Sequence, residues 1–108
     1  MDVNEFFEAL PARYNRTAAA GMTKTIQWHI TDADPGVWAF EITDGEGRLI
    51  PGGVDSPDTT FTTDTATWIG VAQGEQDAMR AFMTGRLKVT GDTMLATRSA
   101  ELFGSQPA

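Results

Sequence analysis

The chain has 108 residues, of which 41% are hydrophobic and 21% charged, and its formal net charge is −7 at pH 7. This length predicts a single domain over residues 1–108 with one hydrophobic core. The acidic balance argues against nucleic acid as a partner, because phosphate binding needs a basic face, and it leaves at most transient contact with an anionic membrane. The chain has no cysteine, which excludes disulfides, thiolate chemistry and cysteine-based metal sites.

No targeting or membrane-spanning segment is found in the sequence. The N-terminal residues lack an apolar run of signal-peptide length, and the C-terminal residues do not form a peroxisomal address. No stretch approaches the roughly 18 apolar residues of a spanning helix. We therefore expect a cytoplasmic protein.

The first half of the chain is expected to form a helical segment and a sheet. Apolar side chains recur at helical spacing over residues 3–20, where Pro11 predicts two short helices or a kink. Three segments then change to the period of two that is typical of strands, and tight turns rich in Asp and Gly join them. These segments cover residues 23–31, 37–43 and 48–50. Together they predict an antiparallel meander.

The second half alternates between strands and helices. The β-branched run at residues 59–63 predicts a fourth strand. Asp64 and Asp77 then stand where helix N-caps are expected, and Gly74 and Gly85 end the two helices. The remaining elements are a fifth strand and a last helix, at residues 86–90 and 92–103. This order favours an α+β fold, in which a five-stranded, mostly antiparallel sheet has helices packed on one face.

One segment carries a more specific pattern. The run AFMTGRLKVTGD extends from Ala81 to Asp92, follows Gly74 and a polar turn, and precedes Leu95 and Ala96. It resembles the sterol-carrier-protein type two family, where a glycine and a polar turn precede a run such as AFMSGKLKVKGN and a lipid-covering helix. The upstream half is similar more loosely, so the resemblance spans nearly the whole chain.

The resemblance implies a hydrophobic tunnel between sheet and helices that holds a lipid-like ligand (a fatty acid, an acyl thioester or a sterol-like molecule) without catalysis. Apolar side chains of the sheet and of the later helices are expected to line it. They are Trp28, Ile30, Trp38, Phe40, Phe61, Trp68, Ile69, Met79, Phe82, Met83, Met94, Leu95 and Phe103. Met94 stands where the family often has glycine, so it could fill part of the tunnel. The plain alternative is that these residues form the core that any α+β domain needs.

We expect no enzymatic activity, metal site or cofactor. His29 is the single histidine and is expected on the solvent side of its strand, away from any triad or zinc site. Arg86 and Lys88 share one face of the fifth strand, where they either meet a lipid headgroup or an acidic partner, or keep an edge strand solvated. Two other functions stay open. One is a ligand-free interaction module or homodimer, and the other is an accessory domain that presents an apolar substrate to an enzyme.

Overall fold

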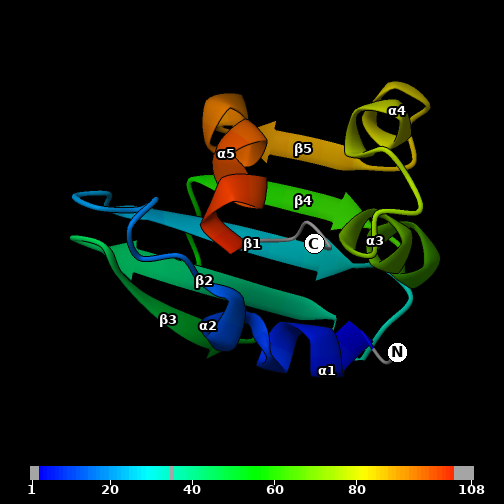
Figure 1. Ribbon diagram of the computed structural model, residues 1–108. Coiled ribbons are helices and arrows are strands. Elements are labelled where there is room, and N and C mark those ends of the chain that lie inside the picture. The colour runs from blue at the N-terminus through cyan, green and yellow to red at the C-terminus, as the bar shows by residue number, and fades with distance from the viewer. Residues whose placement is uncertain (1–2, 35, 104–108) are drawn as a thin grey trace.

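A computed structural model describes residues 3–34 and 36–103 of the chain. The elements are α1 (Val3–Glu8), α2 (Leu10–Arg13), β1 (Lys24–Ile30), β2 (Val37–Thr43), β3 (Glu46–Pro51), β4 (Thr59–Thr63), α3 (Thr65–Ala72), α4 (Ala78–Met83), β5 (Lys88–Gly91) and α5 (Thr93–Phe103). The five strands form one sheet in the order β3-β2-β1-β4-β5. All five helices lie in front of one face of this sheet (Figure 1), which confirms the predicted α+β fold.

The sheet is antiparallel except at its centre. β1 pairs with β2 in the antiparallel sense and with β4 in the parallel sense. In this register Trp28 lies opposite Trp38 on one side and opposite Phe61 on the other, and Phe61 lies opposite Val89 of β5. Because paired residues point to the same face of a sheet, these four side chains form a continuous inner row from β2 to β5.

The β2–β3 hairpin is tighter than expected. Asp44 and Gly45 have φ values of 49° and 84°, which make the two-residue turn that suits the twist of paired strands. The hydroxyl of Tyr14 donates a hydrogen bond of 2.7 Å to the Gly45 carbonyl. As a result β3 begins at Glu46, two residues before the predicted start. At the other edge, β5 begins at Lys88, two residues after the predicted start.

The helical prediction for residues 3–20 was right at its start and wrong at its end. Pro11 lies in the first turn of the short helix α2, so two helices form as expected. The helix then stops, because Tyr14 is extended and the Asn15 N–H donates to the carbonyl of Leu102 at 2.6 Å. The Asn15 side chain accepts the N–H of Ala18, so the chain turns here instead of continuing as a helix.

The core is an aromatic cluster between the helices and the sheet. Phe7 of α1 is fully buried and lies against the rings of Trp28, Trp38 and Trp68, with centroid distances of 5.4, 5.8 and 6.3 Å. Phe103 of α5 contacts Trp28 at 5.8 Å. Aromatic pairs at such distances add to the stability that burial gives. The first and last helices are therefore joined through Trp28.

Replacing Trp28 with Ala tests whether this side chain serves packing. Trp28 is 1% exposed, so Trp28→Ala should lower the free energy of unfolding by about 3–5 kcal/mol through lost burial and a cavity. The measurement is urea unfolding followed by circular dichroism. Met94→Ala is the control, because Met94 is 77% exposed and its truncation should change stability by less than about 0.5 kcal/mol. Equal losses in both variants would contradict the assignment.

Candidate ligand-binding groove

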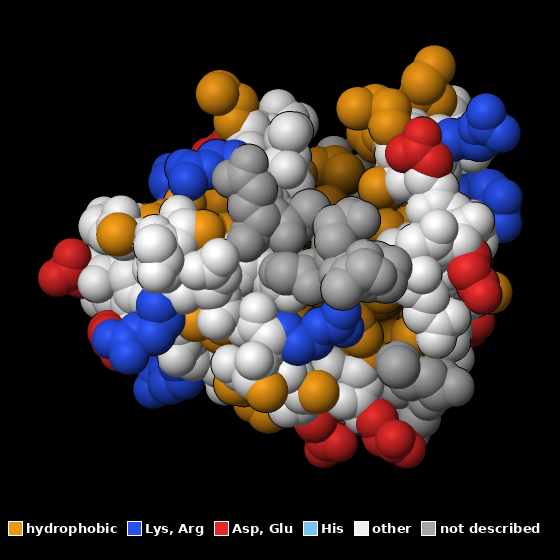
Figure 2. Space-filling view, viewed as in Figure 1, with side chains coloured by type: hydrophobic (Ala, Val, Ile, Leu, Met, Phe, Trp, Pro, Cys, Tyr) orange, Lys and Arg blue, Asp and Glu red, His pale blue; other side chains and the backbone are white. Residues whose placement is uncertain are grey.

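An apolar groove of about 410 Å³ lies between α4 and α5 above the edge of the sheet. Its floor comes from β4, β5 and the residue preceding β5, and its walls come from the two helices. The lining residues are Phe61, Leu87 and Val89 on the floor, Ala78, Met79 and Phe82 on α4, and Thr93, Ala96 and Thr97 on α5. Figure 2 shows this hollow near the top of the molecule, with hydrophobic side chains visible inside it.

Helix α4 is held so that its largest apolar side chains stay exposed. Its side chain contact with the core is made by Ala81, which is buried, and the Ala81 carbonyl accepts the N–H groups of Arg86 and Leu87 at 2.9 and 3.1 Å. The small Ala81 side chain allows the helix to approach the sheet closely. Met79 and Phe82 then face the groove with 61% and 47% of their surface exposed.

Helix α5 is fixed at its start by contacts with the loop before β4. Gly91 has φ 88°, and a side chain there would collide with the Asp58 carbonyl, so glycine is required at this close approach. The same carbonyl accepts the Asp92 N–H at 2.8 Å. The Asp92 carboxylate in turn accepts the N–H groups of Met94 and Leu95 at 3.0 and 3.1 Å, which caps the helix.

The pKa of Asp92 is lowered from its ordinary value. The N–H of Leu95 is the main cause, and the Lys24 ammonium at 3.6 Å and the N–H of Met94 act in the same direction against partial desolvation. Asp32 behaves in the same way, because its carboxylate accepts the N–H and the hydroxyl of Thr65, both at 2.8 Å. Both carboxylates therefore stabilise helix starts in their ionised form.

The structure divides the thirteen predicted lining residues into three groups. Phe61, Met79 and Phe82 line the groove. Trp28, Ile30, Trp38, Phe40, Leu95 and Phe103 are buried in the core, and Trp68 and Ile69 pack against it. Met83 and Met94 are each 77% exposed and lie outside the groove lining. Met94 instead lines a hollow on the other side of α5, so it does not fill the groove.

The sequence analysis did not predict the other six residues that line the groove. Leu87 and Val89 could have been found, because their spacing of two places both on the inner side of the fifth strand. Ala78 and Ala96 are small, and Thr93 and Thr97 are polar, so pattern alone gave them no priority. Their position at the groove depends on how the two helices are set on the sheet.

Two indole rings whose N–H groups are buried pack against Phe61 of the groove floor. Among the described residues, no hydrogen-bond acceptor meets the indole N–H of Trp28 or that of Trp68. Both indole rings contact Phe61, with centroid distances of 6.2 and 5.7 Å. A buried unpaired donor is unfavourable by about 1–3 kcal/mol, so an acceptor that reached either indole would gain a hydrogen bond.

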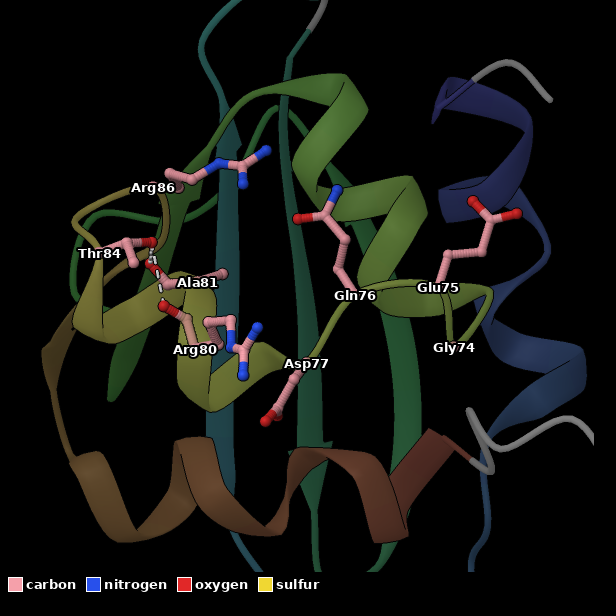
Figure 3. Close-up of a pocket in the computed structure, with 8 residues that line it drawn as sticks. All are labelled: Gly74, Glu75, Gln76, Asp77, Arg80, Ala81, Thr84 and Arg86. Atoms are coloured by element: carbon pink, nitrogen blue, oxygen red, sulfur yellow. Dashed lines mark hydrogen bonds between the residues drawn. The ribbon is translucent and has the colours of Figure 1, made fainter.

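A second, polar pocket of about 770 Å³ lies on the other side of α4, toward α3. Figure 3 shows that Arg80 and Arg86 extend into it from α4 and from the following loop, that Asp77 lies beside Arg80 at the start of α4, and that Glu75 lies on the opposite side. The Asp77 carboxylate accepts the Met79 N–H at 3.1 Å. Among the described residues, no group of three or more His, Asp or Glu could hold a metal ion, and no helix is long and apolar enough to cross a membrane.

Asp92→Asn tests the electrostatic part of the α5 cap. Because the folded-state pKa is lowered, the charge stabilises the fold above the unfolded pKa of about 4, and this contribution is lost as the pH falls through the folded value. The variant should be less stable than the parent at neutral pH, and the difference should shrink below about pH 4. Urea midpoints measured across this pH range check it.

Asp55→Asn is the matched control, since it removes the same charge from an exposed loop and the described residues give its side chain no hydrogen bond. It should leave the midpoint nearly unchanged throughout. A similar pH-dependent difference for both variants would contradict a specific role for Asp92.

Known proteins with the same fold include a small protein solved in a palmitated form and a segment of a larger enzyme. A solved structure of palmitated SCP2L2 from Aedes aegypti superposes with a TM-score of 0.73 over 95% of each chain, at 23% identity. The sec-alkylsulfatase Pisa1 from Pseudomonas sp. contains a segment that matches all of this chain with a TM-score of 0.76 and 23% identity, and that covers 17% of the enzyme.

Sequence comparison also finds a sterol carrier protein and a segment of a longer protein among the relatives. Hydroxysteroid dehydrogenase-like protein 2 of Xenopus tropicalis is 25% identical over 107 residues, which are 98% of this chain and 26% of the relative. Sterol carrier protein 2 of Homo sapiens is 28% identical over 65 residues, which are 60% of this chain and 12% of the relative. The chain thus spans about a quarter or less of the length of these relatives. The model of the SCP-2 sterol transfer family matches residues 3–104, and the chain belongs to this family.

Proposed function

We propose that the chain binds a long-chain lipid-like ligand, such as a fatty acid or an acyl thioester, in the groove between α4 and α5. The observation that carries this proposal is the groove itself. Its floor of Phe61, Leu87 and Val89 is apolar and continuous with the aromatic core. Large exposed apolar side chains, here Met79 and Phe82, typically mark a binding surface. The internal tunnel that the resemblance implied stays a prediction.

The size of the groove suits such a ligand. Its volume of about 410 Å³ falls within the range of small-molecule sites. Burying about 400 Å² of apolar ligand surface at about 25 cal/mol per Å² gives roughly 10 kcal/mol before the costs of association, which supports micromolar binding. The flexible Met79 side chain can adapt to different chains, so we expect broad specificity.

The unpaired indole N–H groups favour a ligand with a polar end that can accept a hydrogen bond. Both indole rings pack against Phe61, and their N–H groups have no partner among the described residues. A carboxylate or carbonyl oxygen that reached either N–H would satisfy it. The palmitated state of the Aedes aegypti neighbour also supports a fatty acyl ligand. A fatty acid should therefore bind better than an alkane of the same length.

The lining residues support carriage of the ligand without catalysis. The groove-lining residues include the hydroxyls of Thr93 and Thr97 and no His, Asp or Glu. His29 lies exposed on the outer side of β1, across the sheet from the groove.

A second candidate function is that of an accessory domain that presents a ligand to an enzyme. The observation in its favour is that the relatives with matching segments include long proteins named as enzymes, such as the Pseudomonas sulfatase and the Xenopus dehydrogenase-like protein. In this case the groove would bind the apolar part of a substrate, and the reacting groups would come from another domain. Ligand binding by the isolated chain is common to both functions.

Thr97→Trp tests the groove by filling it. Thr97 is exposed on α5 and faces the groove, so a tryptophan there occupies ligand volume without removing any core atoms. We expect the affinity for a fluorescent fatty acid, followed by titration of its emission, to fall at least tenfold, which corresponds to about 1.4 kcal/mol. Urea unfolding should show little change in stability.

Thr90→Trp is the matched control. Thr90 is also exposed, but it lies opposite Thr60 on the outer face of the sheet. This variant should bind the probe as the parent does. Unchanged binding by Thr97→Trp, in a protein that binds the probe, would place the ligand elsewhere.

A further inference from the structure

β5 is an open edge of the sheet, and part of its backbone points away from the molecule. The strand order places β5 last, with β4 as its neighbour (Figure 1). Just after β5, the Asp92 N–H donates to the Asp58 carbonyl on the β4 side, and the direction of backbone groups alternates along a strand. Thr90 therefore bonds toward β4, whereas the N–H and C=O groups of Val89 and Gly91 face outward.

The groove is open on this same side. Its floor reaches β5 at Leu87 and Val89, and its walls are α4 and α5. Among the described elements, none lies beyond β5 in the sheet, and Figure 2 shows the hollow at the top of the molecule between two hydrophobic projections. Met79 and Phe82 remain 61% and 47% exposed. The groove thus lacks one wall in the single chain.

The helix surfaces beside the groove are also apolar. Met83 of α4 and Met94 of α5 are each 77% exposed. Side chains of this size present up to roughly 200 Å² each, so together with Met79 and Phe82 they expose on the order of 500 Å². A standard interface buries about 800 Å² on each partner. These four side chains would supply more than half of it.

The edge is electrically neutral, although the chain as a whole is acidic. Residues 74–92 contain equal numbers of acidic and basic side chains, so the net charge of −7 is carried by the rest of the chain. They are Glu75, Asp77 and Asp92 against Arg80, Arg86 and Lys88. Net charge of one sign keeps identical chains apart, and a neutral apolar surface is where two copies can approach. This favours a second copy over a strongly charged partner.

We propose that two copies of the chain pair through β5, antiparallel, around a two-fold axis at Thr90. In this register Val89 of each copy lies opposite Gly91 of the other, which satisfies the outward N–H and C=O groups of both strands. Because α4 precedes β5 and α5 follows it, α4 of one copy lies beside α5 of the other. Each copy supplies the missing wall of its partner's groove. In this respect the inference rests on the proposed function.

The opposite edge of the sheet is less suited to pairing. β3 ends in Pro51, which has no N–H to donate. Its Glu46 and Arg48 form ion pairs with Arg16 and Glu41. Proline and charged side chains are the features that keep edge strands from pairing. β5 contains no proline, so the choice between the two edges favours β5.

Disulfide cross-linking tests both the edge and the register. The chain has no cysteine, so one substitution introduces a single thiol. In the proposed dimer the two copies of Thr90 are directly opposed in a pair without mutual hydrogen bonds, with Cα atoms about 4.5 Å apart. A disulfide spans this distance. Thr90→Cys should therefore give a covalent dimer in high yield on mild oxidation, seen on a non-reducing gel.

Lys88→Cys is the matched control. Lys88 lies opposite Thr62 and Thr90 opposite Thr60, so both side chains are on the outer face of the same strand. The two copies of Lys88 would be roughly 14 Å apart, which is too far for a disulfide. We expect little covalent dimer from this variant. Equal cross-linking of the two variants would contradict the register.

Sedimentation velocity over a range of concentrations measures the association itself. Thr90→Glu places like charges opposite each other and should raise the dissociation constant of the dimer at least tenfold. Thr17→Glu makes the same change in an exposed turn beside Glu46, at the β3 edge, and should leave the constant unchanged. Met83→Ser/Met94→Ser should also weaken the dimer, although neither residue lines the groove. Urea unfolding of each variant checks that the fold is intact.

The fluorescent fatty acid separates this inference from the proposed function. If each copy closes the other's groove, the fatty acid should lower the dissociation constant of the dimer, because binding and association are reciprocally linked. A chain that binds the fatty acid but stays monomeric at every concentration would overturn the dimer and keep the proposed function. A dimer that is unaffected by Thr90→Glu would overturn the β5 interface. Association through β5 without fatty acid binding would refute the proposed function and leave the interface standing.

Discussion

The structure depends on one row of apolar side chains across the inner face of the sheet. Trp38, Trp28, Phe61 and Val89 lie next to one another on four neighbouring strands. At one end of the row Phe7 packs on the tryptophans, and at the other end Phe61 and Val89 become the floor of the groove. Burial is therefore complete where the N-terminal helix covers the row and incomplete where α4 and α5 leave a space between them.

The exposed side chains follow from how α4 is anchored. A small residue, Ala81, faces the core, and its carbonyl holds the start of the last strand through Arg86 and Leu87. The helix has only six residues, so few positions remain to cover its larger side chains.

Much of the fold could be predicted because its signals are local. Alternation of Ile26, Trp28 and Ile30 defines a strand face, and Asp64 and Asp77 cap helices through N–H groups a few residues away. The end of the first helical segment could not be predicted, because it depends on a hydrogen bond between Asn15 and the distant Leu102. Which apolar side chains line the groove also depends on contacts between distant segments, and the sequence does not show these contacts.

An apolar residue on a short helix is compatible with the core, with a groove wall or with the outer surface. Met79 lines the groove, whereas Met83, four residues later on the same face of the helix, is not among the lining residues and is 77% exposed. The choice between these positions depends on how the helix is placed on the sheet and on where along it the groove ends. That placement is set by tertiary contacts, which the order of residues along α4 does not reveal.

The parallel ladder at the centre of the sheet has a consequence for the time course of folding. β1, β2 and β3 are joined by short turns, whereas the ladder between β1 and β4 pairs Ile26 with Thr59, 33 positions later. Closing so long a loop costs entropy before any contact rewards it. We therefore expect the meander to become protected first in pulse-labelled hydrogen exchange and β4 and β5 to follow. The groove, whose floor lies on β4 and β5, would then form last, after the β1–β3 meander is complete.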